Sequence, residues 1–253
     1  MNLGNVVSAE LVKIRTVPSY LIASAVAVLL CGLGALSIAG ALNAQGTIPL
    51  VARGDAAASQ GGSATVISIP SDVLLYLMMV IGVLIATADL RNGTLRISSM
   101  MVPWRGRLLA GKFAAAAVLG LVVALAGLAA GYVGGLLGAG GAFAPFAGDG
   151  PVVLLAILLA APFAAVLGVS VGLLLRSTAA AVSTLLIWGL GVEQILVFVL
   201  PQNVAAFLPF KTVGANASII GVLGPLPGLA VFAVFVAVVA FAATAVHSRR
   251  DLA

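Results

Sequence analysis

The sequence predicts an all-α integral membrane protein with six transmembrane helices, and three observations lead to that fold class. Hydrophobic residues make up 62% of the 253 residues and charged residues only 8%, whereas soluble domains carry about 25% charged residues. The apolar residues fall into six runs of roughly 20, the length that a helix needs to cross a bilayer. Charged residues lie almost entirely between these runs.

The composition also excludes several classes of protein. The net charge is +5, but the positive residues are spread between apolar runs rather than gathered on one basic face, so nucleic acid is not the expected partner. The chain has a single cysteine, Cys31, and a single histidine, His247. It therefore lacks a disulfide framework and the material for a transition-metal site.

Residues 1–18 predict an interfacial helix ahead of the first span. Three apolar residues share one face of this helix: Val7, Leu11 and Ile14. Glu10 and Lys13 lie off that face, so we expect the helix to rest on the membrane surface. Pro18 then stands where the start of a helix tolerates proline.

The six spans are predicted at about residues 20–42, 71–88, 113–137, 152–175, 179–200 and 227–246, and they form a single transmembrane domain. The first run is too long for the apolar core of a signal peptide, and no clear cleavage site follows it. It is therefore counted as a span. An even number of spans places both termini on the same side of the membrane.

Positive charge indicates which side that is, because cytoplasmic loops carry an excess of Lys and Arg. If the N-terminus is cytoplasmic, most positive residues lie inside: Lys13, Arg15, Arg91, Arg96, Arg105, Arg107, Lys112, Arg176, Arg249 and Arg250. Only Arg53 and Lys211 would then lie outside. We therefore predict that both termini are cytoplasmic.

The three outer connections differ in composition. Residues 43–70 are rich in Gly, Ala and Ser and predict a flexible external loop. Residues 138–150 are short and glycine-rich. Residues 201–226 are apolar, interrupted by prolines and too short to cross, which is typical of re-entrant or interfacial helices at the outer surface.

Residues 106–113 read GRLLAGKF, one residue short of a nucleotide-binding P-loop. The pattern G-x-x-x-x-G-K is complete, but Phe113 stands where Ser or Thr would bind Mg²⁺. A P-loop also follows a buried strand, whereas this stretch follows a membrane helix. We expect no ATP hydrolysis by this chain, and we interpret Lys112 as a positive anchor at the inner end of the third span.

Residues 168–172 read GVSVG and match the nucleophile elbow G-x-S-x-G. That elbow needs a strand–turn–helix, whereas Ser170 lies in the middle of a predicted span. Small residues four apart occur here and in the third span: Gly168 and Gly172, and Gly127, Gly131 and Gly135. Such spacing favours close approach of membrane helices over an intramembrane protease.

Residues 89–112 form the longest predicted cytoplasmic stretch and contain a short amphipathic helix. Gly93 can end the second span, Thr94 can cap the new helix, and Pro103 terminates it. Four residues form its apolar stripe: Ile97, Met100, Met101 and Trp104. Ser99 lies off the stripe. The residues leave two interpretations open, a helix resting in the headgroup layer or a helix docked in a partner's groove.

Glu193 is the one charged residue well inside a predicted span, in the outer half of the fifth. A charge near the centre of a membrane helix costs roughly 2.5–3.5 kcal/mol, so its side chain should face protein or water. Two interpretations remain open. Glu193 is either a gate or substrate-path residue, or a structural carboxylate that is protonated or bonded to Trp188, Gln194 or Lys211.

Several motifs, in this order along the chain, resemble the membrane-spanning permease subunit of type-2 ABC transporters, the ABC-2 family, in its compact bacterial form. They are SAELVKIRT before the first span, ADLRNGTLR closing the second, VPWRGRLLAGK opening the third, LRSTAAA between the fourth and fifth, IWGLGVEQILVFVLP…LPF near the fifth, and the terminal RRD. The chain departs from the family at Asp89, where Glu is frequent.

The resemblance implies a role for each cytoplasmic segment. The N-terminal helix would be an elbow helix that carries Glu10, Lys13 and Arg15. The segment after the second span would be a coupling helix that docks on a separate ATP-binding subunit. Its docking residues would be Asp89, Arg91, Gly93, Thr94, Arg96, Ile97, Met100, Met101, Pro103 and Trp104.

The resemblance also implies the assembly. Two permease chains, identical or paralogous, would combine with two ATP-binding subunits in the bacterial cell membrane and export a substrate. ATP and Mg²⁺ would bind to the partner ATPase, and this chain would bind no cofactor itself.

Two other functions fit the six-span plan. One is a proton-coupled secondary carrier that uses Glu193, and the other is a non-transporting immunity or assembly protein. A carrier more often shows several ionisable groups within the membrane, and only one is predicted here. A non-transporting protein would have no ATPase partner.

Overall fold

The computed structural model describes residues 3–45, 63–91, 105–139, 143–146, 150–212 and 223–250. These residues are mostly helical, with no strand among them. The helices are α1 (Leu3–Thr16), α2 (Pro18–Ala44), α4 (Ser63–Arg91), α6 (Arg105–Ala139), α7 (Gly150–Leu175), α8 (Thr178–Leu186), α9 (Glu193–Val199), α10 (Gln202–Ala205) and α12 (Pro225–Arg250), with a π-helical segment, η2 (Ile187–Val192), between α8 and α9.

Six of these helical stretches are long and apolar enough to cross a membrane: α2, α4, α6, α7, α12 and the continuous run α8–η2–α9. The predicted all-helical fold with six spans is confirmed at this level. The architecture is that of a multi-pass membrane protein.

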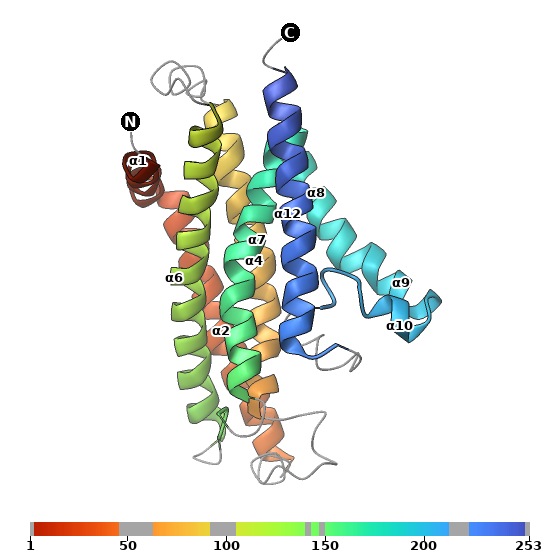
Figure 1. The fold of residues 1–253 in the computed structure, drawn as a ribbon. Helices are drawn as coiled ribbons and strands as arrows, with labels where there is room; N and C mark the ends of the chain where they lie inside the picture. Colours follow the sequence, from red (N-terminus) through yellow and green to blue (C-terminus); the bar gives the residue numbers. More distant parts are fainter. Residues whose placement is uncertain are drawn as a thin grey trace.

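The long helices stand side by side in one bundle, and both termini lie at the same end of it (Figure 1). We call this the terminus-bearing end. The run α8–η2–α9 leans away from the bundle toward the other end, where α10 lies. Figure 1 views α1 nearly along its axis while the long helices run upright, so α1 lies across the bundle rather than along it.

Helices α4 and α7 form the centre of the bundle. In their most apolar parts 61% of the residues are buried, against 33% or less in the other spans. Glycines allow this contact, because a Cβ on Gly82 would overlap the Ala165 carbonyl oxygen and one on Gly168 would overlap the Met79 carbonyl oxygen. The backbones of α4 and α7 therefore touch directly, as small residues permit in membrane helices.

Helices α2 and α6 make a second contact of the same kind. A Cβ on Gly134 would overlap the Gly32 carbonyl oxygen, and one on Gly138 would lie 2.6 Å from the Leu36 carbonyl oxygen. Two turns earlier on α6, Gly127 meets the side chain of Leu74 in α4 and lies beside Cys31 of α2. The glycine spacing of the sequence thus serves helix packing.

The two stretches that match a nucleophile elbow and, in part, a P-loop both lie inside helices. In GVSVG, Ser170 donates a hydrogen bond to the Val166 carbonyl 2.7 Å away, within α7. In GRLLAGKF, the whole stretch is part of α6, which begins at Arg105. Neither the strand–turn–helix of a nucleophile elbow nor the phosphate-binding loop of a P-loop is formed.

The second span begins earlier than the sequence predicts. Helix α4 starts at Ser63 and contains Pro70, whereas residues 43–70 were expected to form one external loop. Pro70 is tolerated because its ring packs against α2, where a Cβ on Gly34 would lie 2.9 Å from it. Tertiary packing here outweighs the tendency of proline to end a helix.

The third span also begins earlier, and this changes the environment of Lys112. Because α6 starts at Arg105 rather than near Phe113, Lys112 lies in its third turn. Its side chain is only 2% exposed. Lys112 is therefore enclosed by protein, and its role as a positive anchor at the inner end of the third span stays a prediction.

A two-residue connection joins α7 to α8 at the terminus-bearing end. Arg176 adopts a left-handed backbone with φ of 53°, a conformation that ends helices. Ser177 then caps α8, since its hydroxyl accepts a hydrogen bond from the Ala180 amide at 3.4 Å. The LRSTAAA motif thus encodes a tight turn between two spans.

We expect Gly168→Ala to destabilise the bundle by about 1–3 kcal/mol, because the added methyl group forces α7 away from Met79 in α4. The effect would be measured as a lower Tm in detergent micelles. Gly40→Ala in α2 is the matched control, since a Cβ there meets nothing within 4 Å. Equal melting temperatures for the two variants would contradict the direct contact.

Candidate functional site

The described residues contain two buried polar clusters, one toward each end of the bundle. The first, which we call the Glu10 cluster, comprises Glu10, Lys13, Lys112 and the carbonyl group of Ile85. The second, the Glu193 cluster, comprises Glu193, Trp188, Phe210 and Lys211. Each cluster joins a spanning helix to a segment that does not span.

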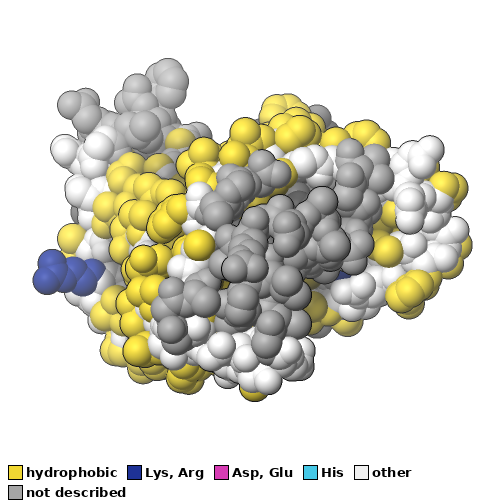
Figure 2. All heavy atoms as spheres, turned by 90° about the horizontal axis from the view of Figure 1, so that it is seen from below, with side chains coloured by type: hydrophobic (Ala, Val, Ile, Leu, Met, Phe, Trp, Pro, Cys, Tyr) yellow, Lys and Arg dark blue, Asp and Glu magenta, His cyan; other side chains and the backbone are white. Residues whose placement is uncertain are grey.

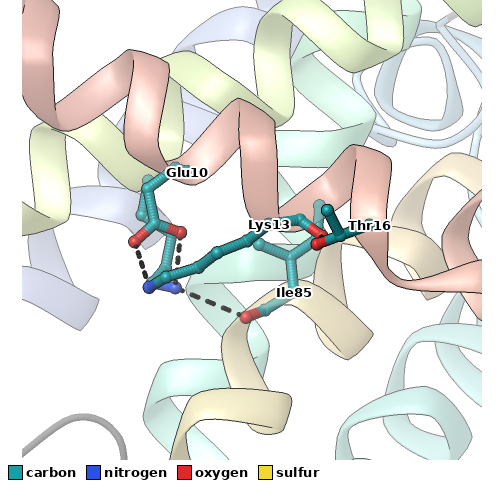
Figure 3. A network of polar contacts seen from close by, with 5 residues as sticks. Glu10, Lys13, Thr16 and Ile85 are labelled. Carbon is teal, nitrogen blue, oxygen red and sulfur yellow. Dashed lines mark hydrogen bonds and ion pairs between the residues drawn. The ribbon is translucent and has the colours of Figure 1, made fainter.

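In the Glu10 cluster, one carboxylate binds two ammonium groups (Figure 3). Glu10 Oε1 lies 2.8 Å from Lys13 Nζ in the same helix, and Glu10 Oε2 lies 3.3 Å from Lys112 Nζ in α6. Lys112 Nζ also makes a long contact of 3.5 Å with the carbonyl oxygen of Ile85 in α4. The cluster therefore links α1, α4 and α6 at the terminus-bearing end.

The face of α1 that packs on the bundle is not the predicted one. Val6, Glu10 and Ile14 are buried, with at most 5% of each exposed, whereas Val7 and Leu11 are only partly buried. Gly111 in α6 receives Val6, because a Cβ on Gly111 would lie 2.5 Å from Val6 Cγ1. Glu10 was expected to face outward, but its place in the buried stripe brings it to Lys112.

The end of α4 bonds to two further helices near the Glu10 cluster. The hydroxyl of Tyr20, at the start of α2, donates to the Leu84 carbonyl at 3.4 Å. The hydroxyl of Thr178, at the start of α8, lies 2.8 Å from that of Thr87. Since Lys112 contacts Ile85, side chains from α2, α6 and α8 all meet α4 within four residues.

Most of the predicted docking residues cannot be placed against these clusters. Asp89 and Arg91 belong to the last turn of α4, and α6 resumes at Arg105. The other eight lie outside the described residues: Gly93, Thr94, Arg96, Ile97, Met100, Met101, Pro103 and Trp104. Arg15 is exposed on α1. Two members of the Glu10 cluster, Lys112 and Ile85, nevertheless lie on the two helices that border residues 92–104.

In the Glu193 cluster, a fully buried carboxylate accepts two hydrogen bonds. Trp188 Nε1 donates to Glu193 Oε1 at 3.1 Å, and the backbone N–H of Phe210 donates to Oε2 at 3.0 Å. The Trp188 contact is one that the sequence offered as an option. The Phe210 contact was missed, because a backbone donor leaves no mark in the sequence.

The π-helical segment brings Trp188 and Glu193 together. The N–H of Glu193 bonds to the Trp188 carbonyl, five residues earlier. On a regular α-helix residues five apart point about 140° away from each other. The wider turn of η2 places both side chains on one face, and π-helical turns are often found at functional sites.

A proline turn presents the Phe210 amide to Glu193. The Lys211 N–H bonds to the Leu208 carbonyl at 2.9 Å, with Pro209 at the position in the turn that favours proline. This leaves the Phe210 N–H free to point at Glu193. The Phe210 ring stacks on Tyr76 of α4, with centroids 6.1 Å apart and planes 7° apart.

Two further ionisable side chains, Asp72 and Lys211, lie near Glu193. Asp72, at the edge of the predicted second span, lies six residues inside the apolar stretch Val66–Ala88, so Glu193 is not the only acidic residue within the described spans. Lys211 is 3% exposed. Burial lowers the pKa of Lys211, while the charges of Glu193 and Asp72 act in the opposite direction.

Figure 2 views the bundle from the end opposite the termini. The described side chains visible there are largely hydrophobic or uncharged, with a few Lys or Arg atoms and no Asp or Glu. Among the described residues, no three His, Cys, Asp or Glu side chains gather as metal ligands would.

An apolar cavity of about 420 Å³ opens between α4, α6 and α7. Its walls include Ile67, Leu128 and Leu154, and the rings of Tyr132 and Phe146 lie beside one another with centroids 5.9 Å apart. The lining offers almost no polar group, so it suits an acyl chain or another apolar ligand and supplies no reactive side chain.

Comparison of the chain with family models, with curated proteins and with solved structures gives no match. Function must therefore be inferred from the contacts within the chain and from its sequence motifs.

We expect Glu193→Ala to loosen the turn at residues 208–212, because the Phe210 N–H then lacks its acceptor. A buried donor left unsatisfied costs about 1–3 kcal/mol. The measurement is amide hydrogen exchange of residues 202–212, which should accelerate. Glu193→Gln, which keeps one acceptor oxygen, should have a smaller effect.

The exposed neighbour Gln194 supplies the control for this test. Gln194→Ala removes a side chain of similar size from the same helix and should leave the exchange unchanged. If both alanine variants accelerate exchange to the same degree, Glu193 does not hold the turn.

Proposed function

We propose that this chain is the membrane permease subunit of an ATP-driven ABC exporter. Two copies, or one copy with a paralogue, would associate with two separate ATP-binding subunits in the bacterial cell membrane, with both termini in the cytoplasm. ATP and Mg²⁺ would be bound by those subunits, and this chain would convert their closure into export of a substrate.

The observation that carries the proposal is the construction of the terminus-bearing end. Helix α1 lies across the bundle and is bonded to α6 through Lys112, which also contacts α4. Side chains of α2 and α8 bond to the same stretch of α4. These linked helix ends border residues 92–104. That segment carries the apolar stripe that is predicted to dock, Ile97, Met100, Met101 and Trp104. A docking segment can move a bundle only if it is attached to a part that resists local bending.

The composition of the spans supports an apolar cargo. The walls of the cavity between α4, α6 and α7 are almost purely apolar, and the spans expose mainly aliphatic side chains. A lipid-like, drug-like or hydrophobic peptide cargo fits this chemistry better than a sugar or an ion.

A proton-coupled carrier is the second candidate, and one observation favours it more than the sequence did. Glu193, Asp72 and Lys211 interact in the half of the bundle away from the termini. Such a group of ionisable side chains could bind a proton. A carrier that acts alone would not need linked helix ends beside residues 92–104. For this reason we rank the carrier second.

The proposal predicts that an ATPase co-purifies with the tagged chain in mild detergent and that the complex has vanadate-sensitive ATPase activity. Changing Ile97, Met100 and Met101 together to Asp should lower the amount of bound ATPase about tenfold or more, since buried anchor residues carry most of an interface's binding energy. The readout is the stoichiometry of the purified complex.

Ser99→Asp is the matched control, because it adds a charge to the same segment off the predicted stripe. It should retain the ATPase. A chain that purifies alone across several detergents would contradict the exporter proposal and favour the carrier or the non-transporting protein.

Glu193 gives a test of the transport path itself. We expect Glu193→Gln to lower ATP-dependent efflux of lipophilic fluorescent probes several-fold without lowering assembly with the ATPase, because the amide keeps the shape and loses the charge. Unchanged efflux, or loss of the complex, would exclude Glu193 as a gate.

A further inference from the structure

The ion pair between Glu10 and Lys112 is placed where it can control the position of α1. The two residues are 102 positions apart in the sequence, and their side chains are 5% and 2% exposed. A buried ammonium group without a partner would be strongly unfavourable, so the folded chain must keep a counter-charge beside Lys112. Glu10 of α1 provides it.

Apolar contacts alone would hold α1 less specifically. Val6 packs with Leu108 and against Gly111, and these contacts could be replaced by similar ones after a small slide of the helix. The ion pair is directional and sits at one point of α6. Lys112 Nζ also reaches the Ile85 carbonyl of α4, so the register of α1 is tied to both helices.

Lys112 and its contact Ile85 each lie about two helical turns from residues 92–104, one on each side of that segment. Ile85 is six residues before the last residue of α4, and Lys112 is seven residues after the first residue of α6. On its other side α1 is joined to α2 through one non-helical residue, Val17, which has an extended backbone. Movement of α1 is therefore passed to the first span across a single residue.

We propose that Glu10 and Lys112 are positioning residues whose ion pair makes α1, the end of α4 and the start of α6 move as one body. Displacement of the end of α4 or the start of α6 then carries α1 with it and, through Val17, shifts α2. The source of the displacement, closure of the ATPase subunits, rests on the proposed function. The inference that α1, the end of α4 and the start of α6 move as one body does not depend on that function.

The first experiment measures amide hydrogen exchange of the full chain in lipid nanodiscs. Lys112→Met and Glu10→Gln each remove one charge of the pair. Both should accelerate exchange of the α1 amides, residues 3–16, by at least about tenfold, because each removes the ion pair that joins α1 to α6 and leaves a buried charge without its counter-charge on the other helix. Unchanged exchange of α1 in both variants would overturn the proposal.

Lys13→Met is the matched control. The Lys13 side chain is 42% exposed, and Glu10 keeps its contact with Lys112 when Lys13 is replaced. Its α1 exchange should rise far less than that of Lys112→Met, because Lys13 pairs with Glu10 within α1 and does not join α1 to α6. In the Lys13→Met background, the charge exchange Glu10→Lys with Lys112→Glu should restore α1 protection to the level of Lys13→Met alone. Failure of this rescue would show that the charges matter separately rather than as a pair.

The second experiment repeats the measurement on the complex with its co-purified ATPase, with and without trapping by ATP and vanadate. In the wild type, exchange in α1 should change together with exchange at residues 105–112. In Lys112→Met, residues 105–112 should still respond and α1 should not. A response of α1 that persists in Lys112→Met would overturn the proposal.

The two experiments separate this inference from the function it builds on. If no ATPase co-purifies, the exporter proposal fails, and the first experiment still decides whether the pair holds α1 in place. If the ATPase is present and α1 is indifferent to Lys112→Met, the exporter stands and the positioning role fails.

Discussion

The direct contact between the backbones of α4 and α7 is the constraint on which the rest of the bundle depends. Within a bilayer the lipid tails are as apolar as leucine, so helices associate through close packing and polar contacts rather than by hiding apolar surface. Gly82 and Gly168 remove the side chains that would keep these two helices apart. The contact of α2 with α6 repeats this solution, and α6 and α12 both pack against α7.

Polar contacts attach to the bundle the segments that take no part in this helix packing. Helix α1 and the turn at residues 208–212 do not span, and each is attached to the bundle by one buried carboxylate, Glu10 and Glu193 respectively. Apolar surfaces in a membrane can slide past one another at little cost, whereas a buried charge has one acceptable position. The two carboxylates thus fix the position of the non-spanning segments on a bundle held together by shape.

The sequence predicted the number and approximate place of the spans, because length and hydropathy are enough to define a membrane helix. It misplaced the starts of α4 and α6, since Pro70 and the basic residues before Phe113 were treated as boundaries that packing overrides. It placed Glu10 on the wrong face of α1, because apolar periodicity assumes that a charge points outward. The partner of Glu10 lies 102 residues away, and pairing over that separation cannot be read from local patterns. The predicted docking stripe falls outside the described residues and stays a prediction.

The π-helical segment in the fifth span has a consequence for how this span can vary between related sequences. A π-helical turn holds one more residue than the α-helical turn it replaces, as if a single codon had been inserted into a regular helix. Loss of any one residue between Ile187 and Val192 would restore a regular helix and rotate everything after it by about 100° relative to α8. Glu193 would then turn away from Trp188, although composition and hydropathy would be nearly unchanged. Among descendants of this gene, the length of this short stretch should therefore be a better marker of retained function than the identity of its apolar residues.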